Sequence, residues 1–414
     1  MTVKTRHAPA GWDAASERLG SRDAAREVLE HLRPKVLGRP DLLVVFASFH
    51  HRALLPEILD MLRADLHPAH LLATTAEATA CGGLEFERGP SLSVLALRLP
   101  GLEAHPFSFD PADGPPSIWS TRFVRDRVAL PVEGGPAPGT VRHRATLLLA
   151  DPFSIHAGQA CARIDAAAGP EGARIHGGVA SGASHPGLNV LAVDRRLASA
   201  GIVGLSLFGD FEVDAFVSEG CAPLGEPLVV TRARDFVIHE LGGVRALDAA
   251  RRMAETIPPE RRDLLSRGLL VGVALDAGKP RLGRGDYLVR EVAAVDPERG
   301  SITLSERVPV GATVCFHLRD PGTAHEDLEL LLDREVLRGD PAAALLFTCN
   351  RRGSRLFGDG EHDAATIARR LSGVPLAGFH TAGELAPVAA RTHLHTLTAA
   401  LAVFRATAPA PDAP

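Results

Sequence analysis

Apolar and polar positions follow one another along the chain in a pattern that predicts an α/β protein. Short apolar runs, such as residues 42–47 and 345–349, are typical of buried strands. Residues 53–66 carry apolar side chains at helical spacing, which predicts an amphipathic helix beside the first strand. The pattern therefore predicts tandem strand–helix–strand units with antiparallel additions, in mixed sheets covered by helices.

One design occurs three times along the chain. Each copy has an apolar strand, a polar turn, a helix, and a second strand that ends in small residues. The copies are LLVVFASF…LLATTAEATACGG, TLLLADPFS…RIHGGVASG and ALLFTCNRRG…PLAGFHTAGELAP. The first and third share the order T-A-(G)-E after the second strand, and we interpret the recurrence as an internal duplication.

The organisation that we expect has four segments: a leader helix in 1–39, an N-terminal part in 40–240, a C-terminal part in 241–405 and a disordered tail in 406–414. No linker of flexible composition lies near residue 240, so we expect two tightly packed parts. Gly209 and Asp210 predict a tight hairpin between two strands. Residues 287–318 predict a meander, and residues 392–405 a single closing strand.

Composition narrows the possible partners and location. A net charge of −5 gives no reason to expect nucleic acid or an anionic membrane as a partner. The five cysteines include no C-x-x-C pair, which argues against a zinc ribbon or a dithiol redox motif. No signal-peptide core and no membrane-spanning run is present, so we expect a cytoplasmic protein with reduced thiols. Arginine in place of lysine, with much Ala, Gly and Pro, suggests a GC-rich bacterial source.

Residues 344–388 contain the strongest candidate for a site. A strand–helix–strand unit of this length predicts two parallel strands, so the loops that follow them open at the same edge of the sheet. α/β proteins usually bind ligands at that edge. The first loop contributes Asn350, Arg351, Arg352, Gly353 and Arg355, and the second contributes Thr381, Gly383 and Glu384.

Several short segments resemble the FIST family, in the family's order and over roughly residues 40–405. They are GCAPLG (220–225), VVTRARD (229–235), NRRGSRLFG (350–358), PLAGFHTAGELAPV (375–388) and LHTLT (394–398). The resemblance implies a FIST N-like and a FIST C-like region, and a sensory domain of bacterial signal transduction that binds a small ligand such as an amino acid. No F-box, kinase, cyclase or helix-turn-helix segment accompanies them, so we expect a stand-alone module with a signalling partner in trans.

The chain departs from the family pattern at three places. Glu77 follows Thr75 and Ala76 without the usual glycine, Ala222 replaces a basic residue, and Thr396 replaces a glycine. These departures bear on whether the family's ligand site is retained, whereas the motif at residues 375–388 is intact.

The charges of the two loops suit a zwitterion. A guanidinium binds a carboxylate with two hydrogen bonds, and Glu384 on the facing loop can accept an ammonium group. The alternative is that one arginine forms a structural bridge with Glu384 while the others face water. The predicted ligand-binding residues are Asn350, Arg352, Gly353, Thr381, Gly383 and Glu384, with Cys221 and His395 as weaker candidates.

Two other functions stay open at this point. One is a hydrolase that uses Cys221 with a nearby histidine such as His239, His380, His393 or His395, and the other is a protein-interaction scaffold. A small buried thiol explains Cys221 equally simply. We expect no metal, because His393 and His395 have no third ligand at matching spacing, and no cofactor, because residues 176–182 fit neither dinucleotide nor Walker patterns.

Overall fold

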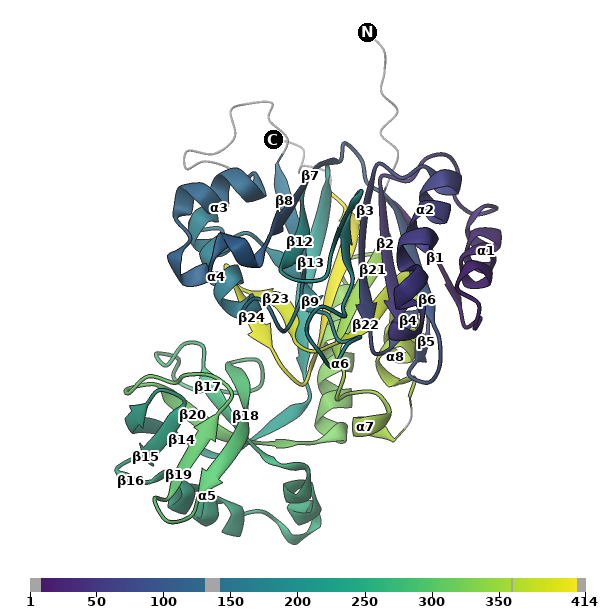
Figure 1. Ribbon diagram of the computed structural model, residues 1–414. Coiled ribbons are helices and arrows are strands. Elements are labelled where there is room, and N and C mark those ends of the chain that lie inside the picture. Colours follow the sequence, from purple (N-terminus) through teal and green to yellow (C-terminus); the bar gives the residue numbers. More distant parts are fainter. Residues whose placement is uncertain (1–8, 131–141, 359, 408–414) are drawn as a thin grey trace, which may run out of the picture. The chain divides into compact units, whose positions relative to one another are not determined.

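The computed structural model describes residues 9–130, 142–358 and 360–407, so most of the expected tail lies outside them. The chain forms two compact units. The first, which we call the three-sheet unit, comprises Met1–Val217, Glu329–Leu394 and Thr398–Pro414. The second, the barrel unit, comprises Ser218–Leu328 and His395–Leu397. Helices and mixed sheets occur together, which confirms the predicted α/β class (Figure 1).

The first sheet is built on two parallel strands that a helix joins. They are β2 (Leu42–Ser48) and β3 (His70–Ala76), connected through η1 (Phe49–Leu54) and α2 (Leu55–Leu66). The order is β1-β6-β2-β3-β10-β11, with β1 (Ala10–Ser16), β6 (Leu92–Arg98), β10 (Leu191–Val193) and β11 (Arg196–Ala198). α1 (Ser21–Leu32) and α2 bury their apolar faces against it.

The second sheet repeats this arrangement. Its parallel pair is β8 (His143–Ala150) and β9 (Ile175–Val179), joined by α4 (Ala157–Ala168). The order is β7-β12-β8-β9-β23-β24, with β7 (Glu103–Phe109), β12 (Ile202–Phe208), β23 (Glu384–Val388) and β24 (Arg391–His395). The short η2 (Pro111–Asp113) and η3 (Pro116–Ile118) precede α3 (Thr121–Val128), which packs with α4 in one apolar cluster.

The third sheet has the same order again. Its parallel pair is β21 (Ala343–Cys349) and β22 (Leu376–Thr381), joined through α7 (Ser354–Phe357) and α8 (His362–Arg370). The order is β13-β25-β21-β22-β4-β5, with β13 (Phe211–Glu219), β25 (Thr398–Ala406), β4 (Thr79–Cys81) and β5 (Leu84–Phe86). α6 (Pro321–Val336) precedes β21 in the chain.

The three repeats exchange their hairpins. β4–β5 follows β3 but joins the third sheet, β10–β11 follows β9 but joins the first, and β23–β24 follows β22 but joins the second. The inner faces of all three sheets contribute to one apolar core, which includes Phe46, Leu147, Phe347 and Phe379. The three strand–helix–strand units expected from the sequence are therefore confirmed, and the exchange of hairpins ties each repeat to the next.

The barrel unit lies in sequence between β13 and α6. Its six antiparallel strands close into a ring in the order β14-β20-β17-β18-β19-β15, because β15 pairs again with β14. They are β14 (Cys221–Arg234), β15 (Val237–Leu241), β17 (Leu269–Ala274), β18 (Tyr287–Asp296), β19 (Ser301–Leu304) and β20 (Thr313–Arg319). β16 (Val244–Arg245), α5 (Ala246–Glu255) and η4 (Pro259–Arg267) complete the unit.

Three local predictions need correction. β12 and β13 lie in different sheets, so Gly209 and Asp210 form no hairpin and instead carry the chain from one repeat to the next. The closing strand is interrupted at Leu397, whose φ of 65° breaks the extended conformation between β24 and β25. The leader contains β1, a strand that the sequence analysis did not predict. No helix in the described parts of the chain is long and apolar enough to cross a membrane.

Candidate functional site

The two loops of the predicted site meet at one edge of the third sheet. β21 and β22 are parallel, and the Asn350 N–H donates to the Thr381 carbonyl at 2.9 Å just beyond the paired residues. The two loops therefore start side by side, as the strand–helix–strand pattern predicted. The side chains in these loops separate into a buried group and an exposed group.

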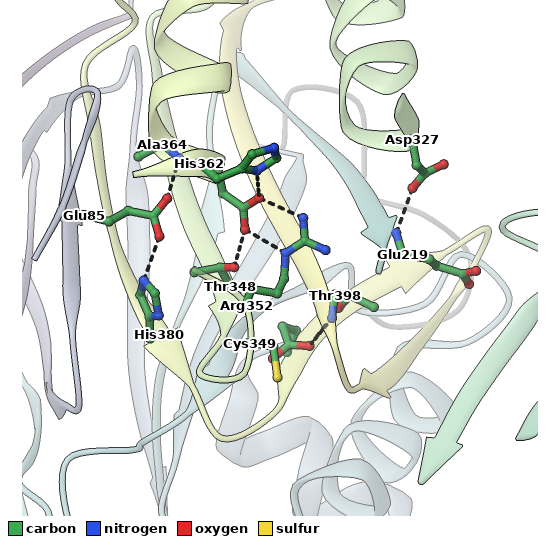
Figure 2. Close-up of polar contacts among 12 residues, drawn as sticks. Glu85, Glu219, Asp327, Thr348, Cys349, Arg352, His362, Ala364, His380 and Thr398 are labelled. Carbon is green, nitrogen blue, oxygen red and sulfur yellow. Dashed lines mark hydrogen bonds and ion pairs between the residues drawn. The ribbon is translucent and has the colours of Figure 1, made fainter. Parts of the chain in front are cut away.

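Arg352 belongs to the buried group. Its Nε and Nη2 atoms each donate to Asp363 at 2.7 Å, and neither side chain is exposed. Thr348 Oγ1, beside Arg352 in Figure 2, also donates to Asp363 at 2.7 Å. Burial by itself would raise the pKa of Asp363, but the Arg352 guanidinium holds it well below its usual range. Two nitrogens of Arg352 are thus committed to a buried ion pair that links the loop to α8.

The third nitrogen of Arg352 has different surroundings. Nη1 is buried and has no hydrogen-bond partner among the residues that the structure describes. A buried N–H group without a partner is costly, so this atom is the point where Arg352 can donate a hydrogen bond to a water or a ligand oxygen. A ligand can therefore form a single hydrogen bond with Arg352, through Nη1. The pair of hydrogen bonds that the sequence analysis expected for a ligand carboxylate is formed with Asp363 instead.

Glu384 is also completely buried. Its carboxylate accepts hydrogen bonds from Thr381 Oγ1 at 2.6 Å, Thr398 Oγ1 at 2.7 Å and the Thr398 N–H at 3.2 Å. Burial raises the pKa of Glu384 to about 7, although these hydrogen bonds favour the charged form. Gly383 donates its N–H to Thr381 Oγ1 at 3.2 Å. Thr381, Gly383 and Glu384 therefore form a closed network in which the Glu384 carboxylate already has three donors.

The exposed group forms what we call the rim cluster: Glu77, Asn350 and Arg355. Asn350 Nδ2 donates to one Glu77 carboxylate oxygen at 3.0 Å, and Arg355 Nη2 donates to the other at 2.5 Å. Arg355 Nη1 donates to the Asn350 carbonyl at 2.6 Å. The side chains of Arg355 and Glu77 are 54% and 38% exposed, so a ligand can reach both charges from solvent.

The sequence analysis did not select Glu77 as a site residue. Aligning T-A-E of the first repeat with T-A-G-E of the third makes Glu77 equivalent to Glu384, whereas the structure makes another residue equivalent. The carbonyl of Gly383 accepts from the Val179 N–H at 2.9 Å, and the carbonyl of Ala78 accepts from the His380 N–H at 3.0 Å. The residue that occupies the position of Glu384 in the first repeat is therefore Thr79, which follows Ala78. Glu77 corresponds to the exposed Ala382, which places its carboxylate on the rim.

Glycine 353 allows the loop to pass close to the first repeat. Its φ of 53° and ψ of −138° suit glycine, and an added Cβ would lie 2.1 Å from a Glu87 oxygen. Glu87 accepts from the Ser354 N–H at 2.7 Å, and Glu85 contacts His380 nearby (Figure 2). No sequence signal joined Glu85 and Glu87 to this loop, because their proximity depends on the exchanged hairpin.

The two weaker candidates belong to the barrel unit. Cys221 is the first residue of β14, pairs in register with Arg319 and is 1% exposed. His395 is also buried, and its neighbour Thr396 donates to the Val289 carbonyl at 3.0 Å within that unit. Their participation in ligand binding stays a prediction.

Comparisons with known proteins give a consistent result. The model of the FIST N domain matches residues 41–244, and the model of the FIST C domain matches residues 246–387. An uncharacterized protein of Mycobacterium tuberculosis is 37% identical over 386 residues, which are 92% of this chain and 96% of that protein. An uncharacterized protein of Mycobacterium bovis is 36% identical over 387 residues, which are 93% and 96% of the two chains.

A solved structure gives a weak likeness. A crystal structure of a cyanuric acid hydrolase from A. caulinodans is 10% identical, with a TM-score of 0.35 over 97% of this chain and 100% of that one. A likeness of this size carries no argument about function.

Proposed function

The chain belongs to the FIST family, a sensory, small-ligand-binding family of signal transduction, and we propose that it binds a ligand of the amino-acid class at the rim cluster without catalysing a reaction. The observation that carries this proposal is the exposed contact between Glu77 and Arg355 at the carboxyl edge of parallel strands. The proposal keeps the zwitterion expected from the sequence but assigns its two charged groups to different residues.

The chemistry of the rim cluster fits both ends of an amino acid. Arg355 can bind a ligand carboxylate, and Glu77 can accept an ammonium group. The existing pair between them is exposed, and such pairs contribute only about 0–1 kcal/mol, so a ligand can replace it at little cost. Asn350 offers an amide beside both groups. Arg352 and Glu384 then act beneath the ligand, by holding the loops in place.

The hydrolase alternative is less well supported. A reactive cysteine needs a partly exposed, electropositive environment, whereas Cys221 is 1% exposed. Burial raises the pKa of Cys81, Cys161 and Cys315, which keeps those thiols protonated. We therefore propose a sensor that passes its signal to a partner protein in trans. The five cysteines form no disulfide bond with one another in the described structure, which supports the reducing cytoplasm as its location.

A thermal-shift screen against the amino acids tests the proposal. A ligand at a hundred times its dissociation constant adds about 2.7 kcal/mol of stability, which should raise the melting temperature by about 5 °C. Arg355→Ala should abolish this shift. Arg33→Ala is a matched control, because Arg33, just after α1, forms a similarly exposed pair with Asp65 of α2 at 2.5 Å, and it should leave the shift unchanged.

The outcomes separate the competing functions. A sensor recovers its ligand intact after incubation, whereas a hydrolase consumes it and loses that activity in Cys221→Ala. A shift that Arg355→Ala and Arg33→Ala leave equally intact would place the ligand elsewhere and contradict the rim cluster as the site.

A further inference from the structure

A second cluster of chemically active side chains lies on the outer face of the third sheet and shares no residue with the rim cluster. Glu85 Oε2 contacts His380 Nε2 at 2.9 Å, and Glu87 lies two residues after Glu85, just beyond the end of β5. One ligand atom from each of Glu85, Glu87 and His380 can be chosen so that all three lie within 4.8 Å of one another. Glu85 and His380 are buried, and Glu87 is half-buried.

The register of the exchanged hairpin explains this convergence. Glu85 in β5 pairs with Ala80 in β4, and Ala80 pairs with Gly378 in β22. His380 lies two residues beyond Gly378 and therefore points to the same face. Because Ala80 and Gly378 fill little space, Glu85 and His380 reach each other across the intervening strand. The first repeat supplies the carboxylates and the third supplies the imidazole.

The hydrogen bonds around the cluster orient its carboxylates. The Ala364 N–H donates to Glu85 Oε1 at 2.8 Å, which leaves Oε2 facing His380 (Figure 2). The Ser354 N–H donates to Glu87 Oε1 at 2.7 Å, and the Ser354 hydroxyl donates to Glu87 Oε2 at 2.5 Å. Metal-binding carboxylates are typically held by such outer partners, which fix their direction and strengthen binding.

The charge of the cluster is not balanced by its own residues. The two carboxylates carry a charge of −2, and the neighbouring Arg352 and Asp363 cancel each other. A divalent ion bound by both carboxylates would bring the sum to zero. Burying unbalanced charge is expensive, so the cluster gains from a cation that bonds to all three groups.

We propose that Glu85, Glu87 and His380 form a binding site for a divalent transition-metal ion of the Zn²⁺ type. One imidazole and two carboxylates are typical ligands of zinc and its neighbours, whereas Mg²⁺ and Ca²⁺ prefer oxygen ligands alone. The ion would join hairpin β4–β5 of the first repeat to β22 of the third. Three protein ligands leave one position of a tetrahedral ion for water.

Calorimetric titration of the chelator-treated full chain with ZnCl₂ tests the site. We expect one ion per chain, because one ligand atom from each of the three residues can converge on a single ion. This measurement uses the unaltered protein and does not depend on any variant's folding.

Two variants assign the binding to these residues. Glu87→Gln and His380→Gln should each weaken Zn²⁺ binding by at least about 100-fold, because loss of an outer partner alone costs about 10–100-fold. His70→Ala is the control, since His70 contacts the single carboxylate of Asp194 at 3.1 Å, and it should bind Zn²⁺ like the unaltered chain. Absence of stoichiometric binding, or equal binding by Glu87→Gln, would overturn the proposal and leave a buried Glu85–His380 ion pair.

Discussion

Replacing Arg352 with alanine should destabilise the three-sheet unit strongly, because it leaves the Asp363 carboxylate buried without its partner. Both side chains are fully buried, and two hydrogen bonds of 2.7 Å join them. Removing one member of a buried ion pair costs about 3–5 kcal/mol. Arg355→Ala, in the same loop, is the matched control and should cost no more than about 1 kcal/mol, because its ion pair is exposed.

The stability lost in Arg352→Ala should depend on pH, because Arg352 changes the pKa of Asp363. In the unaltered protein Arg352 lowers the pKa of Asp363, so the pair stabilises the fold above the unfolded-state pKa and loses this effect as the pH falls. Without Arg352, burial raises the pKa of Asp363 instead. The difference in unfolding free energy between the two proteins should therefore be larger at pH 8 than at pH 5.

Tryptophan fluorescence during urea unfolding measures this difference. The chain has two tryptophans, Trp12 and Trp119, and both belong to the three-sheet unit that contains Arg352. The double variant Arg352→Met with Asp363→Leu should recover most of the loss, because it removes the stranded charge. If Arg352→Ala costs less than about 1 kcal/mol, or if the double variant is no more stable than Arg352→Ala, the reasoning is wrong.

Three further predictions concern other buried positions. Glu384→Gln should remove a fall in stability that the unaltered chain shows as the pH rises from about 4.5 through 7, since burial raises the pKa of Glu384 to about 7; urea midpoints at pH 5 and 8 measure it. Burial lowers the pKa of His176 to about 3, so His176→Leu should reduce the loss of stability below pH 6.5 in the same assay. Gly177→Ala should lower the free energy of unfolding by about 3 kcal/mol or more, because the new Cβ would lie 1.8 Å from the Leu148 carbonyl oxygen. Gly283→Ala is the control, since it has open space around it and should remain soluble on expression.

The repeated parallel units could be predicted because their signal is local. Residues 345–347 and 376–379 are buried in the structure and form runs without a polar side chain in the sequence. The strand–helix–strand connection between them then predicts parallel strands. Parallel strands place the following loops together, and the contact between Asn350 and Thr381 follows from this geometry.

The exchange of hairpins could not be predicted, because it depends on contacts between distant segments. β4, β5, β10 and β11 have three residues each, too few to show an alternation of apolar and polar positions. β4 pairs with β22, which lies near the other end of the chain. The closure of the barrel depends in the same way on the second pairing of β14 with β15.

The charge types at the site could be predicted, but their burial could not. Arg352 and Arg355 lie in one polar loop and look equivalent in the sequence. Gly353, with its positive φ, lies between them, and Arg352 points inward to Asp363 whereas Arg355 points outward to Glu77. A helix was expected between the two strands, but nothing in the spacing singled out Asp363 as the partner of Arg352.

The most direct test of ligand binding at the rim cluster compares an amino acid found by screening with two analogues, its carboxamide and its deaminated acid. Calorimetry should show that Arg355→Ala weakens binding of the amino acid and of the deaminated acid by about 10-fold or more, because a hydrogen bond to a charged group contributes about 1.5–3 kcal/mol. Binding of the carboxamide should be unchanged. Glu77→Gln should weaken binding of the amino acid and of the carboxamide but not binding of the deaminated acid. Equal effects of either substitution on all three compounds would contradict the assignment of Arg355 to the carboxylate and Glu77 to the ammonium group.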